Sequence, residues 1–199
     1  MERKNSWKDY NETGLNELEQ LGKAYREFLD KGKTERECVK YLVELAKKSG
    51  YQDIEEIRNS GKTLKAGDKV YAVNMKKAIA LFQIGKKSII EGMNILGAHI
   101  DSPRLDVKQN PLYEDADFAY LDTHYYGGIK KYQWVTLPLA IHGVVEKKDG
   151  NVVEVVIGEE ENDPVFCVTD LLIHLAGEQM EKKANKVIEG EQLDILVGS

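Results

Sequence analysis

Cysteine is scarce in this sequence, and so are the features of a secreted or membrane-bound protein. The chain has 199 residues and only two cysteines, Cys38 and Cys167. Neither a disulfide framework nor a cysteine-based zinc knuckle is therefore expected. No run approaches the roughly 18 apolar residues of a membrane span, and no apolar stretch follows the charged first residues, as a signal peptide would require. We expect a cytoplasmic protein with no membrane partner.

A surplus of positive charge is also missing. The 34 acidic and 28 basic residues give a formal net charge of −6, which is the wrong sign for a surface that binds DNA or anionic lipid. Nucleic acid is therefore not an expected partner. With 42% apolar residues, the chain is long enough to bury one sizeable core or two small ones, so we expect a globular protein.

Several common functional motifs are absent as well. No Gly-x-Gly-x-x-Gly follows an expected strand, and Gly61-Lys62-Thr63 lacks the upstream glycine of a phosphate-binding loop because Glu56 occupies that position. The sequence also has no Gly-x-Ser-x-Gly and no His-Glu-x-x-His. These absences disfavour nucleotide binding, the usual serine hydrolase and the zincin class of metalloprotease.

The first third of the chain is expected to be helical. Apolar residues recur at three- and four-residue spacing from Leu15 to Leu29, which places them on one stripe of an amphipathic helix. Thr34 and Glu37 have the spacing of a capping box. The spacing predicts that a second helix begins there and ends near Gly50, where a glycine can adopt a left-handed conformation.

The hydrophobic pattern changes to that of strands at residue 69. Residues 69–74 and 78–84 are β-rich runs around a polar turn, a pattern typical of a hairpin. Residues 93–100 form a continuous apolar run, which favours a strand covered on both faces of an α/β sheet. Residues 109–117 contain a proline, an asparagine and several acidic residues, so they predict a surface connection close to a domain boundary.

The second half of the chain is predicted to be mainly strands. Residues 134–146 and 152–158 are β-like and flank Asp149-Gly150, a strong hairpin signal, whereas residues 168–184 return to helical spacing. Residues 193–197 begin another apolar strand, so the sequence is expected to be cut short there; the alternative is a last edge strand. We predict an α/β fold in which the two N-terminal helices pack on a sheet that contains residues 93–100, with one domain over residues 1–105 and a β-rich second domain over 106–199.

His99 and Asp101 are the candidate site residues, because the apolar run at residues 93–100 ends beside them. Ligands of α/β sheets gather at the carboxyl ends of strands, and side chains two residues apart in an extended chain project to the same side. A carboxylate commonly fixes the second nitrogen of a metal-bound imidazole. The aspartate could instead orient a bound group, and the histidine could be a hydrogen-bonded core residue. The tripeptide alone leaves these readings open.

A longer set of motifs is more specific. Residues 97–108 (GAHIDSPRLDVK), 110–114 (NPLYE) and 123–134 (THYYGGIKKYQW) resemble the aspartyl aminopeptidase family of zinc metallo-aminopeptidases, especially its bacterial members. The match is close over about residues 93–145. A His-x-Asp-Ser-Pro loop and a Tyr-Gly-Gly segment occur together in the order that the family has.

The resemblance implies both a fold and an activity. It implies the N-terminal part of a catalytic domain, followed by an inserted dimerisation domain. The activity would be that of an aminopeptidase that uses two zinc ions to remove N-terminal residues from peptide substrates. In that enzyme His99 would be a metal ligand and Asp101 the catalytic acidic residue that holds it. His174, in an Ile-His-Leu setting, would contact substrate across a subunit interface of a homo-oligomer. His124 and His142 match no ligand position, so structural roles are expected for both.

This sequence departs from the family in its length. Family members are longer, and their remaining metal ligands and general-base glutamate lie downstream of the residues present here. Because a two-metal site needs several converging ligands, the 199-residue chain alone is expected to be inactive. Two alternatives stay open: a non-catalytic module that oligomerises through its second domain, and a hydrolase of related fold that acts on a different amide.

Overall fold

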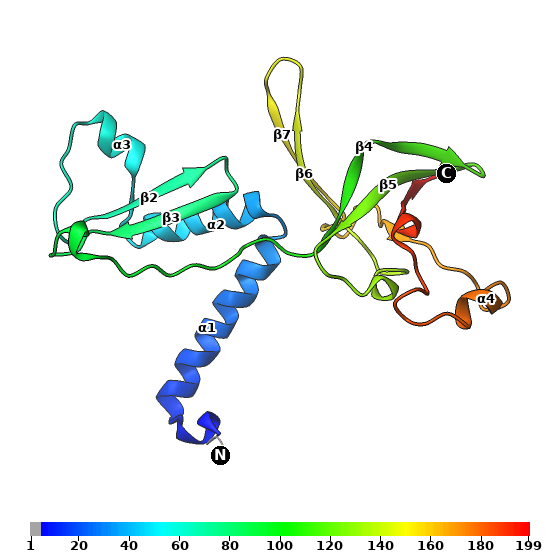
Figure 1. Cartoon of the computed structure of the whole chain (residues 1–199), viewed down its shortest axis with the longest axis horizontal. Coiled ribbons are helices and arrows are strands. Elements are labelled where there is room, and N and C mark those ends of the chain that lie inside the picture. The colour runs from blue at the N-terminus through cyan, green and yellow to red at the C-terminus, as the bar shows by residue number, and fades with distance from the viewer. Residues whose placement is uncertain (1–4) are drawn as a thin grey trace. The chain divides into compact units, whose positions relative to one another are not determined.

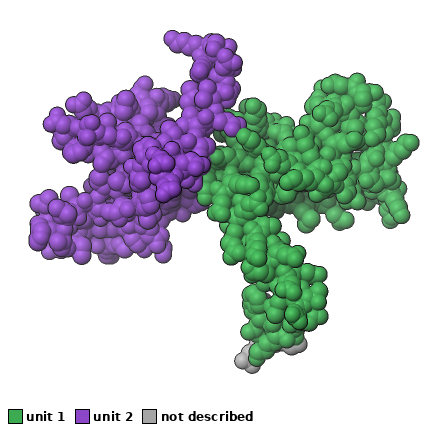
Figure 2. All heavy atoms as spheres, turned by 180° about the vertical axis from the view of Figure 1, so that it is seen from behind, with its two compact units in different colours: residues 1–101 green, residues 102–199 purple. Residues whose placement is uncertain are grey.

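The computed structural model describes residues 5–199 and contains both helices and strands, as predicted for the α/β class. The chain divides into two compact units between Asp101 and Ser102 (Figure 2). The assignment of residues 1–105 to a catalytic domain and of 106–199 to an inserted dimerisation domain stays a prediction. Within the described residues, no helix combines the length and the apolar character needed to cross a membrane.

The helices of the first unit, drawn as coiled ribbons in Figure 1, begin at residues whose side chains accept a hydrogen bond from the helix backbone. After a short 3-10 helix, η1 (Ser6–Asp9), come α1 (Glu12–Lys31), α2 (Glu35–Lys48) and α3 (Ile54–Asn59). The predicted capping box of α2 is confirmed: the Glu37 amide donates to Thr34 Oγ1 at 3.4 Å, and the Thr34 amide donates to Glu37 Oε2 at 2.8 Å. The predicted end is confirmed too, since Gly50 has a φ of 83°.

The sheet of the first unit is small. It has the strand order β1-β2-β3, with β1 (Gln52–Asp53) parallel to β2 (Lys69–Asn74) and β2 antiparallel to β3 (Ala78–Gln83). The hairpin predicted over residues 69–84 is therefore confirmed. Its turn contains Met75 and Lys76, both with positive φ. Helix α2 packs against β2 and β3, and the side chains of Val70 and Tyr71 are buried.

The strand predicted at residues 93–100 is wrong. After a short 3-10 helix, η2 (Ile89–Glu91), residues 92–103 form neither helix nor strand. Ile95 is 80% exposed and Leu96 100% exposed. An extended segment becomes a strand only when a neighbouring strand supplies hydrogen-bond partners, and none of the described strands pairs with it. The predicted packing of the two N-terminal helices on a sheet containing this strand is therefore wrong as well.

The second unit is built on a four-stranded antiparallel sheet with the order β4-β5-β9-β8. Its strands are β4 (Arg104–Asp115), β5 (Phe118–Tyr126), β8 (Cys167–Val168) and β9 (Ile195–Gly198). The surface connection predicted over residues 109–117 is wrong, because most of it lies in β4. Pro111 is tolerated there because the register of β4 against β5 shifts between Val107 and Leu112.

A separate two-stranded hairpin also belongs to the second unit. β6 (Ile141–Glu146) pairs with β7 (Val152–Ile157), so the hairpin predicted around Asp149-Gly150 is confirmed. Its loop is closed by a 2.8 Å hydrogen bond from the Lys147 amide to the Asn151 oxygen, and Gly150 has a φ of 82°. The strand predicted over residues 134–140 is wrong: these residues follow η3 (Lys131–Gln133) and form turns and isolated bridges.

The helix predicted over residues 168–184 is also wrong. Only α4 (Gly177–Met180) is helical there, and Leu172 and Leu175 are 71% and 70% exposed. An amphipathic helix needs a surface to cover its apolar stripe, and short helices are marginal without one.

The strand predicted at residues 193–197 is confirmed as β9, which follows η4 (Gly190–Gln192). It is not an edge strand, because it lies between β5 and β8. The core of the second unit is formed by five buried residues from the last part of the chain: Phe166, Val168, Ile188, Leu193 and Ile195.

Candidate metal centre

His99 and Asp101 lie close together in the irregular segment that follows η2. His99 Nδ1 is 3.1 Å from the backbone oxygen of Asp101 and 3.2 Å from its Oδ1. Because both oxygens accept hydrogen bonds, we assign the proton of a neutral ring to Nδ1, which leaves the lone pair on Nε2. The His99 side chain is 84% exposed. The ring is thus held at one nitrogen and open to an outside ligand at the other.

A buried thiol contacts the backbone of Ile100, the residue between His99 and Asp101. Cys38 Sγ, on α2, contacts the Gly32 oxygen at 3.5 Å and the Ile100 oxygen at 3.6 Å. The Cys38 side chain is buried, and burial raises the pKa of its thiol, so it stays protonated and able to donate. These contacts tie the His99 segment to α2. No sequence signal points to these contacts beyond the position of Cys38 within the second predicted helix.

The residues present can supply one ligand of a metal centre but not a complete set of ligands. An imidazole whose Nδ1 is fixed by a carboxylate and whose Nε2 is open is a normal zinc ligand. Within residues 5–199, however, no group of three or more His, Cys, Asp or Glu side chains is arranged to hold an ion. The roles of His99 as a ligand and of Asp101 as its partner stay predictions.

His174 lies in the other unit, in a turn that precedes α4, and its side chain is exposed. Backbone hydrogen bonds from Leu175 to Leu172 and from Ala176 to Ile173 form this turn. The neighbouring apolar side chains of Leu172, Ile173 and Leu175 are exposed as well. Its predicted contact with substrate across a subunit interface remains a prediction.

The two other histidines make contacts within the second unit. His142 Nε2 lies 2.9 Å from Glu159 Oε1, and only 11% of the His142 side chain is exposed. His124 Nε2 is 4.0 Å from Asp106 Oδ2. These contacts suit the structural roles expected for both residues.

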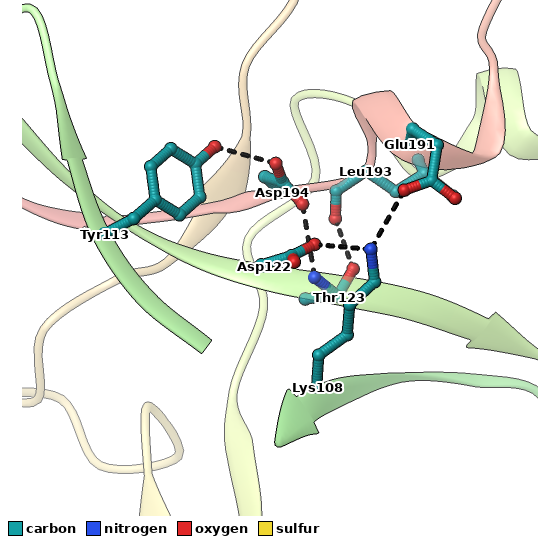
Figure 3. Close-up of polar contacts among 7 residues, drawn as sticks. All are labelled: Lys108, Tyr113, Asp122, Thr123, Glu191, Leu193 and Asp194. Carbon is teal, nitrogen blue, oxygen red and sulfur yellow. Dashed lines mark hydrogen bonds and ion pairs between the residues drawn. The ribbon is translucent and has the colours of Figure 1, made fainter. Parts of the chain in front are cut away.

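Sequence reasoning missed a polar network that joins β4, β5 and the segment leading to β9 (Figure 3). The Lys108 amine lies 2.8 Å from Asp122 Oδ1 and 2.9 Å from Glu191 Oε2, and these two hydrogen bonds raise the pKa of Lys108. The Tyr113 hydroxyl donates to Asp194 Oδ2 at 2.7 Å, and burial together with this bond raises the pKa of Tyr113. Only the fold brings these distant residues together, so no local sequence signal could have revealed them.

Comparisons with known proteins agree on one family. A family model described as Aminopeptidase I zinc metalloprotease (M18) matches residues 28–198. A Clostridium acetobutylicum protein named "Probable M18 family aminopeptidase 1" is 63% identical over 198 residues, which cover 100% of this chain and 43% of that protein. The present chain therefore spans less than half the length of this relative.

Solved structures show the same relationship. The crystal structure of an M18 family aminopeptidase from Thermotoga maritima is similar with a TM-score of 0.89 and 44% identity, covering 100% of this chain and 42% of that one. The S. cerevisiae mApe1 dodecamer is 21% identical with a TM-score of 0.66, covering 91% of this chain and 39% of that one. The second likeness is one of fold alone.

Proposed function

Because the chain belongs to the M18 family of aminopeptidases, we propose that it is the N-terminal part of a zinc-dependent enzyme that removes N-terminal residues from peptides. The observation that carries this proposal is the orientation of His99, whose Nδ1 faces two oxygens of Asp101 while the ring is exposed. A bound pair of zinc ions would supply an activated water and polarise the scissile carbonyl.

The two residues have different tasks in this proposal. His99 would hold zinc through Nε2, the nitrogen that Asp101 leaves open. Asp101 accepts a hydrogen bond from the Nδ1–H of His99, which keeps the imidazole in the tautomer whose Nε2 is free to bind metal. Asp101 therefore acts through His99, by holding the ligand and the site in place.

The chain alone is proposed to be inactive. It spans 43% of the Clostridium relative, and its described residues hold no cluster of three metal ligands. A two-metal site requires ligands from several loops, so the remaining ones would come from residues outside this sequence. A purely non-catalytic module is not favoured, because the matching family and relatives are described as aminopeptidases. Nothing favours a hydrolase that acts on another amide.

Self-association through residues 106–199 belongs to the same proposal. The yeast protein of similar fold is a dodecamer. The turn that carries His174 is flanked by exposed apolar side chains such as those of Leu172 and Leu175, as expected for residues that a neighbouring subunit covers. In this arrangement His174 contacts substrate bound to the neighbouring subunit, in a cytoplasmic homo-oligomer.

The test uses a chimaera that joins this chain to the remaining part of the Clostridium acetobutylicum relative. We expect this protein to bind zinc and to hydrolyse aminoacyl substrates. His99→Ala should abolish activity and lower the zinc content, with an unchanged circular dichroism spectrum. His124→Ala is the matched control, because the His124 side chain is also exposed, at 59%, and has no assigned role in the site. Full activity and unchanged zinc in the His99→Ala protein would show that His99 is not a ligand.

A further inference from the structure

The hairpin formed by β6 and β7 stands apart from the four-stranded sheet of its own unit (Figure 1). Its two strands pair only with each other among the strands of residues 5–199. Each strand therefore has one outer edge whose backbone groups face no other described strand. Such an edge is a template for pairing with another chain.

The hydrogen bond that closes the hairpin loop shows which groups of β7 face outward. The Lys147 amide donates to the Asn151 oxygen at 2.8 Å, and in an antiparallel pair, hydrogen-bonded and non-bonded residue pairs alternate. The odd-numbered residues of β7 are therefore bonded to β6, so the backbone groups of Val152, Glu154 and Val156 point outward. The next group in that series, the Gly158 amide, donates to Asp163 Oδ2 at 2.8 Å. This contact ends the open edge after Ile157.

The outer edge of β7 lacks most of the features that normally prevent strand pairing, and Glu154 is its only charged residue. Its sequence, VVEVVI, contains neither lysine nor proline, and its register against β6 has no bulge. Five of its six residues are β-branched, which favours a strand conformation. Natural edge strands are usually protected by one of these missing features.

One face of the hairpin is entirely apolar. Cross-strand partners share a face, so Val145 lies with Val153, and Ile141 lies with Ile157. The base of this face, at Ile141 and Ile157, packs against the core of the second unit. Val145 and Val153, towards the tip, are 53% and 39% exposed. The apolar surface therefore continues beyond the part that the unit itself covers.

We propose that the outer edge of β7 pairs antiparallel with β7 of a second copy of this chain, with Val155 of each copy opposite Val155 of the other. The inference rests on the self-association proposed above and names the surface that carries it. A two-fold axis normal to the sheet places one residue opposite itself. If the two-fold axis passed beside Glu154, the two Glu154 carboxylates would lie opposite each other, which is unfavourable. If the axis passes beside Val155, Val153 of one copy lies opposite Ile157 of the other, and the two Glu154 carboxylates are no longer opposed.

Charge complementarity favours a second copy as the partner. Lys147 and Lys148 lie at the tip of the hairpin, and Glu160 and Glu161 follow its base. Within the described part of the chain, these four side chains make no ion pair. Antiparallel pairing brings the tip of one copy beside the base of the other, so lysines approach glutamates at both ends. The remaining tip carboxylate, that of Asp149, is turned into its own loop by Asn151.

The pairing is expected to be weak on its own. Stable interfaces bury about 1,200–2,000 Å² in total, and an edge of six residues covers only part of that area. Association of the 199-residue chain should therefore depend on its concentration.

Disulfide trapping in the 199-residue chain tests the register. Residues opposite each other in a non-bonded pair have Cα atoms about 4.5 Å apart, which a disulfide can span. Val155→Cys is made in a Cys167→Ser background and treated with diamide, which takes up the two protons and two electrons that the paired thiols lose. The buried Cys38 is retained. Val145→Cys is the matched control, because Val145 lies on the same face and is more than half exposed.

We expect Val155→Cys to form disulfide-linked dimers several-fold faster than Val145→Cys. Equal rates, or faster linkage through Glu154→Cys, would overturn the proposed pairing. Val155→Lys provides a test without oxidation: it should raise the dissociation constant several-fold in sedimentation equilibrium, whereas Val145→Lys should not. If the chain associates but Val155→Cys does not link, the inferred surface is wrong and self-association stands. A chain that is monomeric at every concentration would overturn both.

Discussion

The hydroxyl of Thr123 donates a 2.6 Å hydrogen bond to the backbone oxygen of Leu193, a residue 70 positions later in the sequence. Both residues are buried, with exposed fractions of 1% and 0%. The Thr123 amide also donates to Asp194 Oδ1 at 3.2 Å. Two polar contacts at a single residue of β5 therefore fix the segment that enters β9.

Replacing Thr123 with valine should destabilise the second unit. Valine keeps the shape and removes the hydroxyl, so the buried Leu193 oxygen loses its hydrogen bond, at a cost of about 1–3 kcal/mol. Urea unfolding followed by Trp134 fluorescence measures this, because Trp134 packs against the core of this unit. A Trp7→Phe background removes the other tryptophan. Thr169→Val, at an exposed position, is the control, and equal loss in both variants would contradict the prediction.

Gly158 should tolerate alanine less well than Gly150. Both have positive φ, 106° and 82°, so both substitutions strain the backbone by about 1–2 kcal/mol. At Gly158 an added Cβ would also lie 3.0 Å from the Ala140 Cα and 3.2 Å from the Leu139 oxygen, whereas at Gly150 it meets nothing within 4 Å. The urea midpoint of Gly158→Ala should therefore fall further than that of Gly150→Ala. The reverse order would show that Ala140 moves freely.

Alkaline pH should weaken the second unit through Tyr113. Burial and the hydrogen bond to Asp194 raise the pKa of Tyr113 above its ordinary value. Above about pH 10 the unfolded chain loses this proton while the folded chain retains it, so stability that is complete below that pH falls as the pH rises.

The measurement is the urea midpoint between neutral pH and pH 11. Tyr113→Phe should make the fall less steep, although Lys108, whose pKa is also raised, contributes in the same direction. Tyr132→Phe is the control, because Tyr132 and Tyr113 are equally exposed, at 39%. An unchanged slope in Tyr113→Phe would refute the assignment.

The 199-residue chain should bind zinc weakly and hydrolyse no aminoacyl substrate. One imidazole supplies only one of the several ligands that a two-metal site needs. Metal analysis after dialysis, together with a peptidase assay on the same sample, checks both statements. Nearly two zinc ions per chain with substantial turnover would mean that the site is complete.

His174 should act in trans in the chimaeric protein. Two inactive variants, His99→Ala and His174→Ala, are mixed and allowed to exchange subunits. Some mixed oligomers then pair an intact metal ligand with an intact His174 from the neighbour, so activity should partly return. Each variant taken through the same exchange alone is the control. No recovery after verified exchange would place His174 within its own subunit or outside the site.

Local hydrogen bonds and turns were the parts of the fold that the sequence predicted well. The capping box of Thr34 and Glu37 involves residues three apart, and the two hairpins are closed by turns a few residues long. Such features depend on neighbours in the chain, so their residues carry the information. The same holds for His99 and Asp101, whose contact spans two residues.

Elements that need distant partners were predicted less well. Residues 93–100 have the hydrophobic pattern of a buried strand, and residues 168–184 have that of an amphipathic helix. Leu96 and Leu175 nevertheless remain exposed. A pattern states which face an element would bury but does not supply the surface that covers it. The network around Lys108 and Asp194 escaped prediction for a related reason, because its partners lie on elements far apart in the sequence.

The central position of β9 has a consequence for the order of events during synthesis. A ribosome adds about 5–20 residues per second, so β5 emerges about 4–14 s before the strand that completes its pairing, given the 70-residue separation of Thr123 and Leu193. During this delay β5 has β4 as its only strand neighbour, and the side chains that later surround Leu193 remain in water. The nascent second unit should therefore be a substrate for chaperones that bind apolar segments until residues 195–198 arrive.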